Sequence, residues 1–121
     1  MHMFFKPTAN KIEKWAQKGN IAKLDKIMSG NNVELRNTAI KAIGKCGNID
    51  TINFLSSYAR HPEAEVRKLV AEAMGESGEE RNIEFLRKLV KDDDNQEVRE
   101  AARNAIAKIN KALEHAQEEQ Q

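Results

Sequence analysis

One thiol and three imidazoles are the side chains of this chain that are most reactive near neutral pH without special activation. Cys46 stands between Lys45 and Gly47 at the end of an apolar, helix-like segment. A neighbouring lysine can lower the pKa of a thiol, but nucleophilic catalysis also needs a positioned base beside the nucleophile. The pattern favours the alternative, a half-buried and inert thiol. We therefore expect no catalytic role for Cys46.

The histidines do not indicate a metal site. His2, His61 and His115 are far apart along the chain, whereas a transition-metal site needs several ligands that converge. His61 precedes Pro62, a pattern typical of a turn at a helix start. The glycines stand singly at helix ends, so no phosphate-binding loop is expected. The sequence thus predicts a protein that is not an enzyme and that has no cofactor and no metal.

Charge and composition exclude several classes of partner. The 121 residues include 20 lysines and arginines against 19 acids, so the formal net charge is +1. Such a chain has no net field to gather nucleic acid or an anionic membrane. Its apolar runs fall far short of the roughly 20 residues that cross a bilayer. With one cysteine and no signal-like opening, we expect a cytoplasmic protein. The length of 121 residues favours a single domain, 1–121. The sequence does not indicate the oligomeric state.

The elements that position these side chains are repeated. The pairs Leu35-Arg36, Val66-Arg67 and Val98-Arg99 are separated by shifts of 31 and 32 residues, and the apolar positions around them fall into register. A further unit around Trp15 aligns at a shift of 28. Apolar residues recur at spacings of three and four, the period of an α-helix, so no strand is expected. A helix pair of this length cannot bury its apolar stripe alone, so successive pairs must stack.

The predicted fold class is therefore all-α, a right-handed α-solenoid of about three and a half helix pairs. The units are expected at about 9–30, 31–62 and 63–94, followed by a single C-terminal capping helix at 95–117. Three aromatic residues, Phe4, Phe5 and Trp15, are expected to close the core at the N-terminal end. The seven helices are expected at 9–18, 20–29, 33–46, 48–60, 63–77, 79–91 and 95–117.

The expected helix ends have their own residue signals. Short polar side chains that precede an acid by three positions indicate capping boxes at helix starts, and they occur as Asn10 with Glu13, Asn31 with Glu34, Ser77 with Glu80, and Asp94 with Glu97. Single glycines after the periodic runs indicate left-handed C-terminal caps, and they are Gly19, Gly30, Gly47 and Gly78.

Two stretches resemble a known repeat family. They are EVRKLVAEAMG at 65–75, followed by Gly78, and EVREAARNAI at 97–106. These stretches resemble HEAT repeats, and specifically the short kind first noted in bilin-attaching lyase subunits (PBS lyase or E-Z type). Such modules occur in scaffolds, lyase subunits, hydroxylases and base-excision enzymes, so the resemblance implies a fold more than an activity. Iron-dependent hydroxylation in this fold relies on His-Glu dipeptides, which this chain lacks.

The resemblance implies a structural role for the arginines of the three Leu/Val-Arg pairs. In this family the guanidinium reaches polar groups in the turn of the neighbouring repeat. Arg36, Arg67 and Arg99 would then form an internal ladder. Acids such as Asp92, Asp93 and Asp94 are the expected acceptors. The alternative role is recognition of a phosphate or carboxylate ligand. The first unit has Lys11-Ile12 instead of such a pair, so its rung is in doubt.

The resemblance also implies that the second helix of each pair lines the concave face of the stack. The polar positions there are mixed in sign, which suits a polypeptide partner, although Glu84 and Lys88 at i and i+4 could simply pair with each other. We therefore expect a non-catalytic protein-interaction or scaffold module. The alternative, an accessory subunit of a bilin-lyase-like enzyme, rests on repeat kind alone. The predicted partner-binding residues are Asp25, Asn53, Ser57, Arg60, Glu84, Lys88 and Lys91, and Ser29 is expected on the same face.

Overall fold

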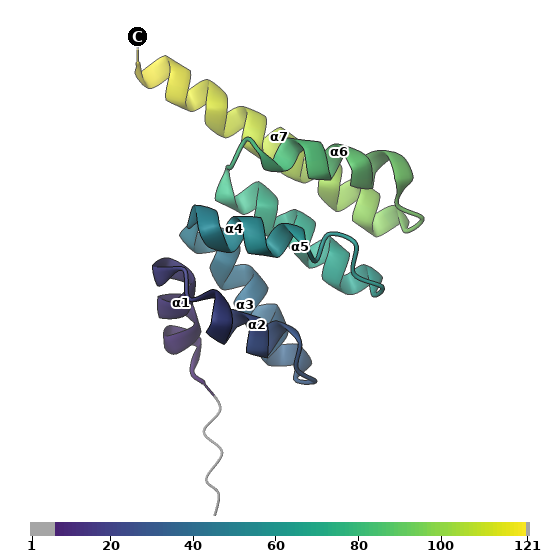
Figure 1. Cartoon of the computed structure of the whole chain (residues 1–121). Coiled ribbons are helices and arrows are strands. Elements are labelled where there is room, and N and C mark those ends of the chain that lie inside the picture. The colour runs from purple at the N-terminus through teal and green to yellow at the C-terminus, as the bar shows by residue number, and fades with distance from the viewer. Residues whose placement is uncertain (1–6, 121) are drawn as a thin grey trace, which may run out of the picture.

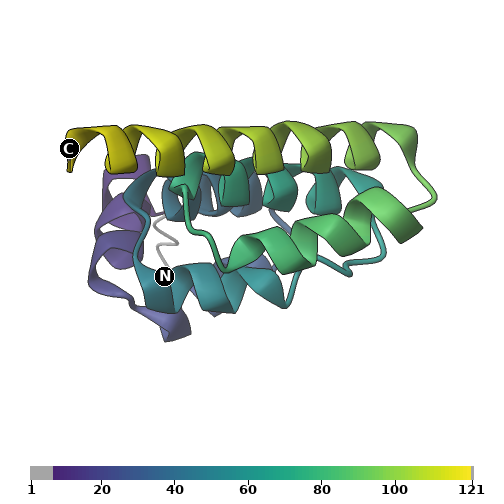
Figure 2. The same cartoon turned by 90° about the horizontal axis from the view of Figure 1, so that it is seen from above.

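Residues 7–120, described by a computed structural model, form seven helices and no strand. The first helices of successive pairs form one layer and the second helices form the other (Figures 1 and 2). Each first helix packs on the next one along the chain, and α6 also packs on α7. The fold is an α-solenoid, as predicted. The helices are α1 (Ala9–Lys18), α2 (Ile21–Met28), α3 (Val33–Cys46), α4 (Ile49–Ser56), α5 (Ala64–Ser77), α6 (Asn82–Asp92) and α7 (Gln96–Glu119).

Two predicted helix boundaries were wrong by several residues. Helix α4 ends at Ser56 instead of residue 60, because the next residues form tighter turns in which Tyr58 N–H donates to the carbonyl of Leu55, three residues back. The hydroxyls of Ser56 and Ser57 also bond carbonyls three residues back, at 2.6 and 2.8 Å, and so compete with the helix. Helix α6 begins at Asn82 instead of residue 79.

Five of the seven helix starts are capped by single polar side chains rather than by the predicted capping boxes, and α5 and α6 have no side-chain cap. The residues that accept from a backbone N–H in the first turn are Thr8, Asn20, Asn32, Asn48 and Asn95. The predicted caps Asn31 and Asp94 were wrong by one residue and Asn10 by two. Ser77 is the last residue of α5 and caps no start.

Three of the four predicted glycine caps are confirmed. Gly19, Gly47 and Gly78 have φ values of 71°, 65° and 69°, in the left-handed region that only glycine adopts without strain. Gly30 was predicted wrongly, because it has no positive φ and α2 ends instead on Ser29 in a right-handed conformation.

Small residues set the spacing of the first-helix layer. A Cβ built on Gly44 would lie 2.8 Å from Ala73 Cα, and one built on Gly75 would lie 2.7 Å from Ala105 Cα. Successive first helices therefore approach each other so closely that only glycine, whose side chain is a single hydrogen atom, fits at these two positions. The core lies between this layer and the second helices, and its largest fully buried side chains include Ile12, Leu24, Ile40, Ile43, Ile52, Leu55, Met74, Leu86 and Ile109.

The N-terminal aromatic group is described only in part. Trp15 is half-buried against the core, as expected of a residue that closes that end, and the ammonium of Lys23 lies 5.9 Å from its ring centroid. Phe4 and Phe5 lie outside the described residues.

Candidate functional site

The seven predicted partner-binding residues all have exposed side chains on the second-helix layer. Asp25 lies on α2 and Asn53 on α4, Ser57 and Arg60 lie in the turn that follows α4, and the other three lie on α6. We call the exposed surface of α2, α4, residues 57–60 and α6 the second-helix face. The residues share a layer as the sequence predicted, and their role in binding stays a prediction.

The second-helix face is hollowed between the turn after α4 and helix α6. This hollow has a volume of about 320 Å³ and brings together only two of the predicted residues, Arg60 and Lys88. We call it the Phe85 hollow, and its lining is Ala59, Arg60, Arg67, Phe85, Lys88, Leu89, Asp92 and Asp93.

Phe85 is a candidate contact residue that sequence reasoning missed. The repeat alignment matches it to Phe54, which is half-buried and makes an edge-to-face contact with Tyr58 at 5.5 Å. Phe85 is instead 40% exposed. The sequence did contain a signal for this exposure. Neighbouring residues on a helix point about 100° apart, and Leu86, the neighbour of Phe85, occupies the centre of the buried stripe. Phe85 therefore lies at the edge of that stripe.

The charged residues of the face differ in how far they are paired. Glu84 accepts from Arg87 at 3.1 Å, so the alternative pairing of Glu84 with Lys88 was wrong. Asp25 accepts from the hydroxyl of Tyr58 at 3.4 Å. Burial, followed by the charge of Asp25, raises the pKa of that tyrosine. Among the described residues, five exposed cations of the face form no ion pair, and these are Lys23, Lys26, Arg60, Lys88 and Lys91.

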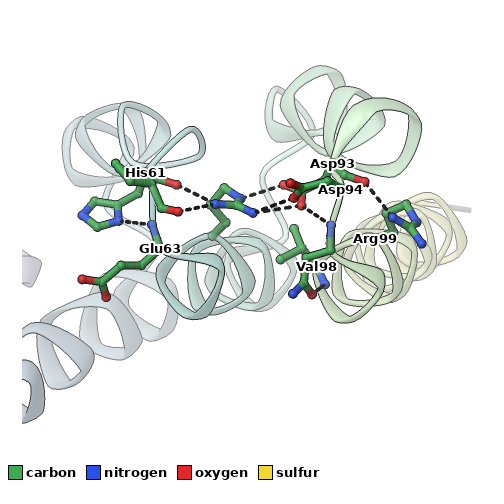
Figure 3. A network of polar contacts seen from close by, with 9 residues as sticks. His61, Glu63, Asp93, Asp94, Val98 and Arg99 are labelled. Atoms are coloured by element: carbon green, nitrogen blue, oxygen red, sulfur yellow. Dashed lines mark hydrogen bonds and ion pairs between the residues drawn. The ribbon is translucent and has the colours of Figure 1, made fainter.

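Arg67, which lines this hollow, is the centre of a polar network. Figure 3 shows its labelled partners His61, Asp93 and Asp94. Its Nε and Nη2 donate to the two carboxylate oxygens of Asp93, at 2.8 and 3.1 Å. Its Nη1 donates to the carbonyls of His61 and Pro62, at 2.8 and 3.0 Å. Asp94 lies 3.3 Å from Nη2. The predicted structural role of Arg67, with Asp93 and Asp94 as acceptors, is confirmed.

The rungs on either side are weaker. Arg36 is buried, but its one bond is from Nη2 to Glu63 at 3.3 Å, an acceptor that the sequence did not suggest, and its Nε has no partner. Arg99 donates to the backbone carbonyl of Asp93 at 2.8 Å. Asp92, also predicted as an acceptor, is bonded by none of the three arginines in the described residues. Each of the three arginines therefore bonds a turn between helices, and Arg67 makes the most bonds.

Asp93 is held as a carboxylate. Burial by itself would raise its pKa, but the bonds from Arg67 and from the backbone N–H of Asn95, with the charges of Arg67 and Arg99, lower it below the ordinary value. Its side chain is only 5% exposed, so the carboxylate depends on these donors in place of water. Arg67 and Asp93 thus form a structural ion pair whose two charges cancel within the fold.

Cys46 has the environment of an inert thiol. It is half-buried and its Sγ lies 3.8 Å from the carbonyl of Glu13. Burial and the charge of Glu13 raise the pKa of the thiol and outweigh the opposite effect of Lys45, which itself lies 3.5 Å from Glu13. The activating effect of Lys45 is therefore not realised.

The remaining chemical candidates have structural contacts. The ring Nδ1 of His61 accepts from the backbone N–H of Glu63 at 3.0 Å, which confirms His61 as a turn residue. Within residues 7–120, no group of three His, Cys, Asp or Glu side chains could hold a metal ion. None of the helices in this part of the chain is long and apolar enough to cross a membrane.

A larger hollow, of about 660 Å³, lies on the first-helix layer and was not predicted. Its floor contains Ala73 and Ala105, the residues against which the two interhelix glycines pack. Ion pairs join its walls, between Lys68 and Glu97 at 3.6 Å and between Lys108 and Glu76 at 2.8 Å. The bond from Lys108 lowers the pKa of Glu76. We call this hollow the first-helix groove, and its charges are largely neutralised by one another.

The repeat pattern and the two-layered stack agree with a comparison against known families. The family model for HEAT repeats matches residues 21–107, from the start of α2 into α7. The chain belongs to the HEAT-repeat family. The predicted resemblance is confirmed at this level, and the match does not separate the short bilin-lyase kind from other HEAT repeats. No curated protein matches the chain. HEAT repeats are generally non-catalytic and commonly act as protein-interaction scaffolds.

Proposed function

We propose that this HEAT-repeat protein binds another polypeptide on its second-helix face and catalyses no reaction. The observation that carries the proposal is the Phe85 hollow, where an exposed aromatic ring lies beside two unpaired cations, Arg60 and Lys88. Interfaces combine an apolar anchor with a polar rim in this way. The mixed polar surface around the hollow extends this contact area over α2, α4 and α6.

The second-helix face is a better candidate than the first-helix groove because, among the described residues, five of its six exposed cations form no ion pair. The walls of the groove are joined by ion pairs, and a partner would have to replace those contacts. With a formal net charge of +1, the chain offers little to a nucleic acid backbone. The accessory-subunit alternative rests on repeat kind alone, and no contact favours it.

The test is a selection of random displayed peptides against the wild-type protein. The selected peptides are then measured against a variant in which Arg60, Lys88 and Lys91 are all changed to Glu. We expect the dissociation constant to rise at least about tenfold, because removing and reversing rim cations costs more than roughly 1.4 kcal/mol. The melting temperature should change by only a few degrees, because all three side chains are exposed.

The matched control changes Lys41, Arg103 and Lys111 to Glu. These exposed cations lie on α3 and α7, in the first-helix layer, so the net charge changes equally while the second-helix face is untouched. The control should bind the selected peptides as wild type does. A selection that enriches no peptide, or a loss of binding that is equal in both variants, would contradict the proposal.

A further inference from the structure

We propose that the bound segment is acidic and inserts one bulky apolar side chain into the Phe85 hollow. This inference rests on the proposed function and narrows its partner from any polypeptide to a peptide rich in Asp and Glu around an aromatic or large aliphatic residue. Three properties of the hollow support it, namely its size, its apolar lining and the sign of its unpaired charges.

The hollow is the right size for a single large side chain. Its volume of about 320 Å³ lies at the lower end of the range of ligand sites, roughly 300–1,000 Å³. Ala59 and Leu89 are 4% and 7% exposed and supply an apolar lining. Phe85 contributes a ring that is 40% exposed and gains burial only if another apolar group covers it. Aromatic pairs of this kind are favourable beyond the area that they bury.

The rim of the hollow has a surplus of positive charge once the internal ion pairs are set aside. Asp93 and Asp94 are bound to Arg67. Glu63, three residues after Arg60 in the sequence, is bound to Arg36. The cations on the rim that form no ion pair in the described residues are Arg60 and Lys88. Lys91, which also forms none, lies about one helical turn further along α6.

Asp92 is the acid on this rim that opposes them, and it forms no ion pair in the described residues. Asp94 is 94% exposed and shares the single positive charge of Arg67 with Asp93, so it also opposes these cations. Three cations therefore face two carboxylates, which leaves a surplus of one positive charge. An anionic segment complements this surface, whereas a basic one would be repelled.

The rigid backing of the hollow favours a preformed site. Arg67 is fixed by bonds to Asp93 and to the carbonyls of His61 and Pro62, so one wall is held by the ladder. A site that is already ordered loses less conformational entropy when a peptide binds. We therefore expect the binding to depend on the peptide sequence and not only on its charge.

The experiment uses fluorescently labelled synthetic peptides of equal length and measures fluorescence anisotropy with the full-length protein. The first has a central Phe flanked by Asp and Glu, the second replaces that Phe with Ser, and the third flanks the Phe with Lys. We expect the first to bind at least about tenfold more tightly than either of the others, a difference of roughly 1.4 kcal/mol or more. Its affinity should fall as salt is raised.

The variant Phe85→Ala separates the apolar anchor from the charged rim. It should weaken the Phe-containing acidic peptide about tenfold and leave the Ser-containing peptide unchanged. The control is Val33→Ala on α3, because Val33 is the other large apolar residue that is exposed within residues 7–120, at 54%, and it lies outside the hollow. That control should bind like wild type.

Several outcomes would overturn the inference. If displayed peptides bind through the second-helix face but are basic or neutral, or bind Phe85→Ala equally well, the inference fails while the proposed function stands. A single-stranded DNA oligonucleotide that binds as tightly as the acidic peptide would show that charge alone is recognised, and would also overturn it. If no peptide binds and the display selection enriches none, the inference and the proposed function fail together.

Discussion

Replacing Arg67 with alanine is expected to lower the free energy of unfolding by about 3 kcal/mol. The variant leaves the buried carboxylate of Asp93 without its main donor and removes the bonds to the carbonyls of His61 and Pro62. Chemical denaturation followed by circular dichroism measures the effect. Arg67→Lys should recover only part of the loss, because an ammonium cannot make the two parallel bonds to Asp93.

The control for this prediction is Arg103→Ala. Arg103 is exposed on α7, and its replacement should change stability by less than about 0.5 kcal/mol. Equal denaturation midpoints for wild type and Arg67→Ala would show that the ladder does not hold neighbouring repeats together.

The acid dependence of stability gives a second readout of the same contact. Because the pKa of Asp93 in the folded state lies below its unfolded value of about 3.9, the carboxylate contributes stability that is complete above that pH. This contribution is lost as the pH falls through the lower, folded-state pKa. The difference in stability between wild type and Arg67→Ala should therefore shrink as the pH is lowered from about 5 toward 2. A difference that stays constant would contradict the assigned ion pair.

Replacing Gly75 with leucine is expected to destabilise the stack by about 3 kcal/mol, at the upper end of the usual cost of overpacking. Even the first added carbon would lie 2.7 Å from Ala105 Cα and 2.8 Å from its Cβ, so α5 and α7 would have to separate. The shift would spread along the layer, because α5 also packs on α3. Denaturation midpoints measure the loss.

Ala107→Leu is the matched control for Gly75. The repeat alignment puts Ala107 at the place of Gly75 in the next unit, but here the side chain is exposed. The same residue introduced there should change stability by less than about 0.5 kcal/mol. If Gly75→Leu and Ala107→Leu unfold at the same denaturant concentration, the close approach of α5 and α7 does not stabilise the fold.

The fold could be predicted from the sequence because its signal is repeated. The Leu/Val-Arg pairs recur at nearly constant spacing, and a helix pair with an apolar stripe must stack on the next pair. The chain order of the helices follows from this pattern, and the structural role of Arg67 follows from the resemblance to HEAT repeats. Both depend on local periodicity and on one residue per repeat, which a single sequence contains.

The errors concern features that depend on neighbouring residues or on tertiary packing. Asn31 stands beside Asn32, and Asp94 beside Asn95, so two adjacent residues could each cap the helix and only the backbone decides between them. Helix α4 ends early because Ser57 bonds the carbonyl of Phe54.

The hollows were beyond sequence reasoning for a different reason. The sequence places Phe85 at the edge of the buried stripe of α6, but the volumes of the two hollows depend on how α4, α5, α6 and α7 pack together. Periodicity identifies the buried stripe of each helix but not the gaps that remain between helices.

The most direct test of the account is a nuclear magnetic resonance titration of the isotopically labelled protein with the acidic, Phe-containing peptide. We expect the backbone amide signals of Arg60, Phe85 and Lys88 to shift most, with smaller changes elsewhere on α4 and α6. The amides that line the first-helix groove, such as those of Glu72 and Asn104, should stay unchanged. Shifts concentrated in that groove, or the absence of any shift at saturating peptide, would contradict a binding role for the second-helix face.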